Sequence, residues 1–164
     1  MNLFIKPSLV LGALAGVIFG ILLLIPFIAP FMFFFSFSLA GIIVIVFLKK
    51  TNSIGIVTLQ DGCLIGALAG FSSLITTSAV YLPVSLLIDK LFNAYSESFN
   101  ISQSLSVISY NIMAVSMLIF FTAILSAIIN AFSGMITAFF FEKLEQKNLT
   151  FKDHLKMEQF DETF

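Results

Sequence analysis

Long apolar stretches, interrupted by short clusters of proline or charged residues, dominate this chain. Lys6 and Lys49 are separated by 42 residues without a charge. A single helix of that length would be about 63 Å long, roughly twice the thickness of a bilayer's hydrocarbon core. The segment must therefore fold back on itself. Pro26 and Pro30 mark the turn, because proline lacks a backbone donor and disfavours helix in the residue before it.

The same pattern continues along the chain and predicts two tandem helical hairpins. A lysine-bearing polar loop follows the second apolar stretch, and Asp61 precedes the third, in which Pro83 should kink or end the regular helix. A Ser-rich connection leads to the fourth. The expected spans are about 8–25, 31–48, 62–88 and 110–141. We therefore predict an all-α, integral membrane four-helix bundle, with a transmembrane domain over 1–143 and a charged tail over 144–164.

Composition supports lipid as the solvent of this fold. The chain is 59% apolar and only 10% charged, with a mean hydropathy of +1.09. A soluble domain is about half apolar and about a quarter charged. The sequence contains no arginine, so a basic groove for nucleic acid is not expected.

The distribution of lysines predicts the orientation in the membrane. With four spans, all lysines except Lys90 fall on one side, and lysine-rich loops stay in the cytoplasm. Both termini should therefore be cytoplasmic (N-in and C-in), in a cell (inner) membrane. Lys6 and the apolar run after it also look like a signal peptide, but no small-residue cleavage pattern follows, which favours an uncleaved first span.

Glycine rows recur in the first and third spans. The pentapeptide Gly-Ala-Leu-Ala-Gly occurs twice, and each copy belongs to a row of glycines four residues apart: Gly12, Gly16 and Gly20, then Gly62, Gly66 and Gly70. Such rows let a second helix backbone approach closely. We favour helix packing over a duplicated hairpin of the transporter type. If the first row faced lipid, it would indicate an oligomer interface.

Neutral polar residues, rather than charges, lie inside the predicted spans. The third span contains Ser72, Ser73 and Thr76, and the fourth contains Asn130. Counting from Asp61 and from Glu142 places Ser73 and Asn130 at the same depth, about 18 Å from the cytoplasmic side. We therefore predict that Asn130 hydrogen-bonds to one of these hydroxyls, because a buried amide needs partners. The cluster is either a clasp between helices or part of a polar pathway.

Residues that could carry catalysis or bind a cofactor are not recognised. No ionisable residue lies between the ends of any span, although pumps and carriers usually have one. The sequence contains no nucleotide-binding or hydrolase motif, and Cys63 and His154 cannot make a metal site of four thiolate or imidazole ligands. We therefore expect no enzyme activity, no catalytic residues, no cofactor and no metal.

The layout resembles that of small four-pass membrane proteins of bacteria and some archaea whose function is unknown. The features that carry the resemblance are the turn at Ile25-Pro26-Phe27, the lysine loop, and the run from Val57 through Asp61 into the second glycine row. The likeness covers residues 8–143. Cysteines are common near the first turn in that group, and this chain has none there. The resemblance implies a multi-pass inner-membrane protein and supplies no active site.

Two functional hypotheses follow from these observations. The first is a non-enzymatic membrane protein that acts through packing or assembly, with the bilayer as its environment and a second copy as a candidate partner. The second is a small-solute carrier or pore lined by the third and fourth spans. A carrier requires a water-accessible cavity flanked by Ser73, Thr76, Thr77 and Asn130, whereas a dry, tightly packed bundle would count against it.

Overall fold

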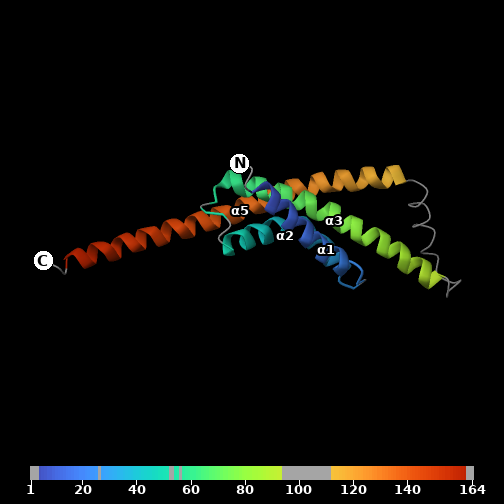
Figure 1. Cartoon of the computed structure of the whole chain (residues 1–164), viewed down its shortest axis with the longest axis horizontal. Helices are drawn as coiled ribbons and strands as arrows, with labels where there is room; N and C mark the ends of the chain where they lie inside the picture. The colour runs from blue at the N-terminus through green and yellow to red at the C-terminus, as the bar shows by residue number, and fades with distance from the viewer. Residues whose placement is uncertain (1–3, 26, 52–53, 56, 94–111, 162–164) are drawn as a thin grey trace.

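The computed structural model describes residues 4–25, 27–51, 54–55, 57–93 and 112–161. Within these ranges the chain forms the helices α1 (Ile5–Leu22), α2 (Ala29–Lys50), α3 (Leu59–Asn93) and α5 (Ile112–Asp161). All four are long and apolar enough to cross a membrane, so the prediction of an all-α fold built from four such helices is confirmed. Helix α3 packs between α1 and α5, and α2 contacts each of the other three (Figure 1).

The turn between α1 and α2 is shifted from the predicted position. Helix α1 ends at Leu22, where the N–H of Leu23 still donates to the carbonyl of Phe19 at 2.9 Å. Pro30 lies in the first turn of α2 rather than in the connection. A proline is tolerated there because the first N–H groups of a helix have no intrahelical acceptor. Pro26, the other proline on which the turn was predicted, lies outside the described residues.

The connection from α2 to α3 begins and ends with local hydrogen bonds. Lys49 and Lys50 occupy the last turn of α2, where cations interact favourably with the helix dipole. At the start of α3, the N–H of Asp61 donates to the hydroxyl oxygen of Thr58 at 3.2 Å, and the N–H of Thr58 donates to the Asp61 carboxylate at 3.3 Å. This reciprocal pair is a capping box, which satisfies donors that the first turn leaves free.

Helix α3 does not end at its internal proline. It runs for 35 residues and continues through Pro83, whose side chain is exposed. The predicted span of 62–88 is therefore extended at both ends. The predicted Ser-rich connection lies outside the described residues from residue 94 onward, as does residue 110, the predicted start of the fourth span.

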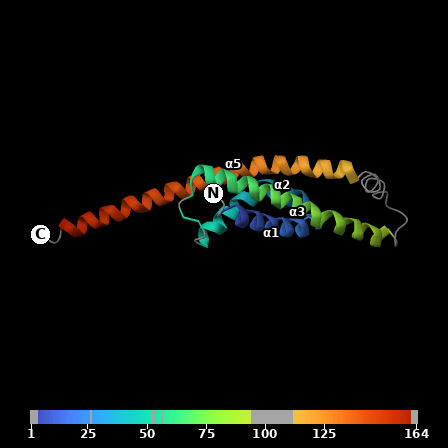
Figure 2. The same cartoon turned by 45° about the horizontal axis from the view of Figure 1, so that its top comes forward.

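Helix α5 continues far beyond the rest of the bundle. It has 50 residues, about 75 Å of helix, and its apolar span covers Ala114–Lys147. The predicted boundary between a span and a separate tail at 143/144 is not a break in the backbone, because the helix runs on to Asp161. Figures 1 and 2 both show this C-terminal part projecting alone from one end of the bundle, while α3 and α5 diverge at the other end.

Close packing in the bundle depends on glycines that face a neighbouring backbone. A Cβ atom on Gly12 or Gly16 would lie less than 3.0 Å from backbone atoms of α3, and Gly20 also faces α3. The first glycine row is therefore buried inside the monomer and does not face lipid. It offers no support for an oligomer interface at that row.

The second glycine row, on α3, faces α5. A Cβ on Gly62 or Gly66 would lie within 3.0 Å of backbone oxygens of Gly134 or Asn130, and one on Gly70 would collide with the Asn130 side chain. The two pentapeptides thus have different neighbours: the copy in α1 packs on a parallel helix, and the copy in α3 packs on an antiparallel one.

The outward faces of the helices are strongly apolar. Phe27 is 88% exposed, Phe34 is 79% exposed, and many large aliphatic and aromatic side chains of α5 are more than half exposed. Soluble monomers rarely expose large contiguous apolar surfaces. Four apolar helices with such outer faces indicate a membrane protein.

Replacing Gly66 by alanine should destabilise the bundle, although alanine is the better helix former by about 1 kcal/mol. The added methyl would meet the backbone oxygen of Asn130, which cannot rotate away, so we expect a net loss of about 1–3 kcal/mol. Thermal unfolding in detergent micelles measures the change. Gly55→Ala is the control, because nothing lies within 4 Å of that position. Equal stability of the two variants would contradict the close contact.

Candidate functional site

Asn130 is the most completely buried amide in the described part of the bundle. Its residue is 0% exposed, and both ends of the amide are used. The side-chain Nδ2 donates to the carbonyl of Phe37 at 2.7 Å and to the carbonyl of Ser126 at 3.0 Å, and Oδ1 accepts from the N–H of Gly41 at 2.8 Å. This one side chain of α5 therefore hydrogen-bonds to the α2 backbone in the interior of the bundle.

The two partners of Asn130 on α2 belong to a single helical turn. In an α-helix the N–H of residue i pairs with the carbonyl of residue i−4, and Phe37 and Gly41 have that spacing. The Asn130 side chain therefore bonds to a carbonyl and an N–H that have the spacing of a helical hydrogen-bonded pair in α2. Its Nδ2 donates to the Phe37 carbonyl, and its Oδ1 accepts from the Gly41 N–H. Gly41 allows this approach, since a Cβ there would lie 2.8 Å from the Asn130 backbone oxygen.

Two hydroxyl groups join two further helix pairs, α1–α3 and α3–α5, by bonding to a neighbouring backbone. Thr77 of α3 donates to the carbonyl of Gly16 on α1 at 3.0 Å, and Ser126 of α5 donates to the carbonyl of Gly70 on α3 at 3.2 Å. In each case the backbone group belongs to a glycine. Absence of a side chain there lets the hydroxyl reach the neighbouring main chain, so these glycines provide both close packing and hydrogen-bonding sites.

The predicted hydrogen bond from Asn130 to Ser72, Ser73 or Thr76 is wrong. Ser72 and Thr76 bond back to carbonyls of their own helix, at Ala69 and Ser72 respectively, and the buried Ser73 hydroxyl has no hydrogen-bond partner. Asn130 is therefore not hydrogen-bonded to the other residues of the expected polar cluster, Ser72, Ser73 and Thr76.

Asp61 and Glu142 do not lie at the same level of the bundle, contrary to the prediction. Gly62 faces Gly134 and Ala138, and Gly66 faces Asn130 and Ala131. Asn130 therefore lies beside Gly66 and Gly70, about one helical turn short of Ser73. Helix α5 is continuous and extends past the N-terminal end of α3. Its first charged residue, Glu142, therefore does not mark the boundary of the bundle.

Three residues of this site were not identified from the sequence. Gly41 and Gly134 are single glycines in their spans and form no row, and Ser126 resembles any other serine in a membrane helix. The sequence does contain a signal for Gly41 and Gly134. A single glycine in a span of otherwise bulky residues indicates a place where another backbone or a polar side chain approaches the helix.

The chemistry available at Asn130 is limited to hydrogen bonding. The groups around it are an amide, hydroxyls and main-chain atoms, none of which titrates near neutral pH. Among the described residues, no group of three or more His, Cys, Asp or Glu side chains could hold a metal. The arrangement holds helices together through hydrogen bonds.

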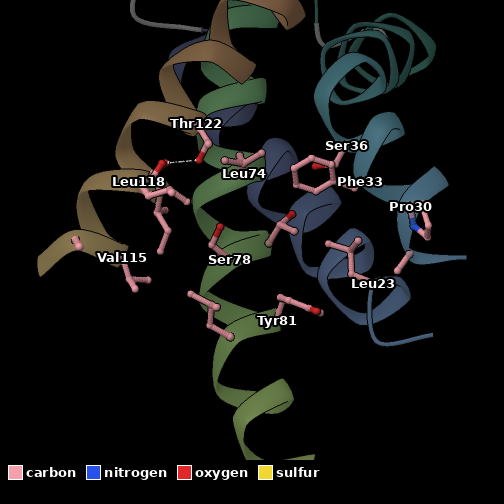
Figure 3. A pocket seen from close by; sticks show the side chains of 15 residues that line it. Leu23, Pro30, Phe33, Ser36, Leu74, Ser78, Tyr81, Val115, Leu118 and Thr122 are labelled. Atoms are coloured by element: carbon pink, nitrogen blue, oxygen red, sulfur yellow. Dashed lines mark hydrogen bonds between the residues drawn. The ribbon is translucent and has the colours of Figure 1, made fainter. Parts of the chain in front are cut away.

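A cavity of about 790 Å³ lies in the half of the bundle away from the lysine loop. It is lined by residues of the α1–α2 turn and of helices α2, α3 and α5 (Figure 3). Of the residues expected to flank a solute pathway, Thr77 lines it, whereas Ser73, Thr76 and Asn130 do not. Its other lining side chains are mostly aliphatic, so it is not the predicted polar pathway.

An ion pair joins α2 to α5 at the opposite end. The Lys49 ammonium lies 2.5 Å from a carboxylate oxygen of Glu145 and donates to the carbonyl of Gly55 at 2.8 Å. The side chains are 18% and 37% exposed, so solvent screens the pair only partly. It fixes the point at which α5 leaves the bundle.

Comparisons of this chain with protein-family models, with curated proteins and with solved structures find no match. The geometry of the bundle is therefore the basis for the function proposed below.

Replacing Asn130 by alanine should destabilise the protein by about 1–2 kcal/mol, because Phe37 and Gly41 lose an interhelical partner. Thr137→Ala is a matched control on the same helix, since that hydroxyl donates to the carbonyl of Ser133 within α5. Chemical denaturation in mixed micelles measures both. The clasp is contradicted if the two variants unfold at the same denaturant concentration.

Proposed function

We propose that this chain is a non-enzymatic, multi-pass membrane protein that works by assembly: its four-span bundle anchors the projecting part of α5, which associates with a second copy at the cytoplasmic surface. The observation that carries the proposal is the unbroken course of α5 from the apolar span to Asp161. A helix that leaves the bilayer without a flexible joint transmits its position and direction to whatever it binds.

The proposed orientation has both termini in the cytoplasm of a bacterial or archaeal cell. Lys49, Lys50 and the start of the α5 projection lie at one end of the bundle, because Lys49 pairs with Glu145. Lys6 lies in the first turn of α1, which runs in the opposite direction to α2 and so begins at that same end. Lysines retained on the cytoplasmic side account for this arrangement.

The sequence of the projection suits pairing with another copy. Over residues 142–161 it contains four lysines and five acidic residues, so its charges nearly balance. Leu144, Phe151 and Leu155 follow a seven- and four-residue spacing, which is typical of helices that associate along an apolar seam. Charges of both signs, interspersed along this segment, favour a helix that pairs with the same helix of a second copy rather than a disordered tail.

A small-solute carrier is the weaker alternative. A carrier needs a route across the bilayer, but between the cavity and the lysine loop the α3 and α5 backbones meet at Gly66, and the polar atoms of Asn130 are already hydrogen-bonded. None of the described residues that line the cavity is charged. These features favour a static bundle.

Ending the chain after Lys147 should abolish self-association while leaving the bundle inserted in the membrane. Two copies carrying different epitope tags are coexpressed, and the fraction that copurifies is measured; we expect at least a tenfold loss on truncation. A protein in which residues 148–164 are replaced by a Gly/Ser linker of equal length controls for the loss of mass and should behave like the truncation.

A second arm tests the seam without shortening the helix. Leu155→Lys should reduce copurification several-fold, whereas Lys156→Glu, which reverses a charge on the side of the helix away from the seam, should have little effect. A fluorescent reporter fused to the C-terminus should fold and fluoresce in the cytoplasm. Undiminished copurification of the truncated protein would contradict the assembly proposal, and a non-fluorescent, periplasmic reporter would contradict its orientation.

A further inference from the structure

The turn of α5 that follows its apolar span carries its charges on two different sides of the helix. Glu142 and Glu145 are three residues apart and share one side, which faces the bundle because Glu145 pairs with Lys49 of α2. Lys143 and Lys147 are four residues apart and share another side, where both are exposed. Each of these two lysines is two residues from Glu145, which is more than half a turn of helix. Both therefore point away from α2.

The two outward lysines continue the apolar side of α5 that faces lipid. Ile136, Phe140, Lys143 and Lys147 follow one another at spacings of four, three and four residues, which places them along one face of the helix. Ile136 is 55% exposed and Phe140 is 62% exposed. A lipid whose acyl chain covers these two side chains therefore has its headgroup beside the two lysines.

The Lys143 ammonium lies back toward the apolar span. Its Nζ is 5.2 Å from the centre of the Phe139 ring, one helical turn closer to the middle of the span, and Phe139 is 42% exposed. The face of a ring attracts a cation without neutralising it. Within the described ranges, no carboxylate forms an ion pair with Lys143 or Lys147. The anion that the surroundings supply at this level is the phosphate of a lipid headgroup.

The balance of charge on this side of α5 favours an anionic headgroup over a zwitterionic one. A zwitterionic headgroup carries an ammonium of its own, but the carboxylates of Glu142 and Glu145 lie on the other side of the helix. An anionic headgroup has no such cation to place and can neutralise both lysines. Each lysine beside a membrane strengthens binding to anionic lipid by about fivefold.

We propose that the outward face of α5 at Lys143 and Lys147 binds an anionic phospholipid. Its phosphate accepts hydrogen bonds from the two ammonium groups, and one acyl chain lies against Phe140 and Ile136. Helix α5 is then held on one side by the ion pair with α2 and on the other by the lipid, which fixes the depth at which it leaves the bilayer. This site does not depend on the assembly proposed above.

Quenching of tryptophan fluorescence measures which lipid lies against this face. The chain contains no tryptophan, so Phe140→Trp introduces a single reporter next to the two lysines. The full-length variant is reconstituted in phosphatidylcholine with increasing fractions of phosphatidylglycerol, one of the two lipids being brominated, and the quenching gives their relative binding constants. We expect a preference of about fivefold or more for phosphatidylglycerol. Phe121→Trp is the control, because Phe121 is equally exposed at 62% but lies toward the other end of α5, and it should show little preference.

Lysine variants made in the Phe140→Trp protein identify the groups that bind the headgroup. Replacing Lys143 and Lys147 together by glutamine should abolish the preference for phosphatidylglycerol, whereas replacing both by arginine, which keeps the charge, should retain it. Lys6→Gln controls for the net charge of the protein. Lys6 is exposed at the same end of the bundle, but α1 does not contact α5 in the part of the chain that the structure describes, so the preference should not change.

Three results would overturn the proposal. Equal preference at the positions of Phe140 and Phe121 would show that this face has no selectivity for lipid. An unchanged preference after both lysines are replaced by glutamine would show that other groups attract the lipid. An equal loss of preference in Lys6→Gln would show an effect of overall charge. If the double variant does not reconstitute, Lys143→Gln and Lys147→Gln are measured singly, and an undiminished preference in both also counts against the site.

Discussion

The backbone contact between α3 and α5 at Gly66 is the constraint on which the rest of this bundle depends. Without side chains at Gly62, Gly66 and Gly134, the two antiparallel main chains approach so closely that an added methyl group would collide with backbone atoms. In lipid the hydrophobic effect does not drive helices to associate. Their association is therefore stabilised by close packing and by hydrogen bonds between helices. The contact brings the Asn130 amide against the turn of α2 that contains Phe37 and Gly41. The hydrogen bonds formed there join α2 to the α3–α5 pair.

The same contact explains why the two halves of the bundle differ. Beyond Gly70 neither α3 nor the facing part of α5 contains another glycine, and the rings of Phe71 and Phe120 pack edge to face with their centroids 6.3 Å apart. The two helices diverge toward the end of the bundle that holds the α1–α2 turn (Figure 2). Residues of both helices line the cavity at that end (Figure 3). At the other end, the Lys49–Glu145 pair holds α5 where its projection begins. Tight packing at one end and a gap at the other thus follow from the positions of a few small residues.

The sequence allowed the class of fold to be predicted, but not the contacts within it. Charge-free stretches and prolines set the number of apolar helices, because the thickness of a bilayer and the chemistry of proline act locally. The partner of Asn130 could not be predicted, because it depends on the axial register between α3 and α5. Helix α5 continues without a break beyond Glu142, so that residue does not mark the register. The cavity was not predicted for a similar reason: it arises from the relative placement of helices that are distant in sequence.

The position of the Asn130 amide between α2 and α3 can be measured most directly by nuclear magnetic resonance on the protein in nanodiscs, with the side-chain amide of Asn130 selectively labelled. The amide protons should exchange slowly with water and give cross-peaks to the N–H of Gly41 and the Hα protons of Gly70. Rapid exchange with water, with cross-peaks confined to residues of α5, would contradict the clasp and the register that depends on it.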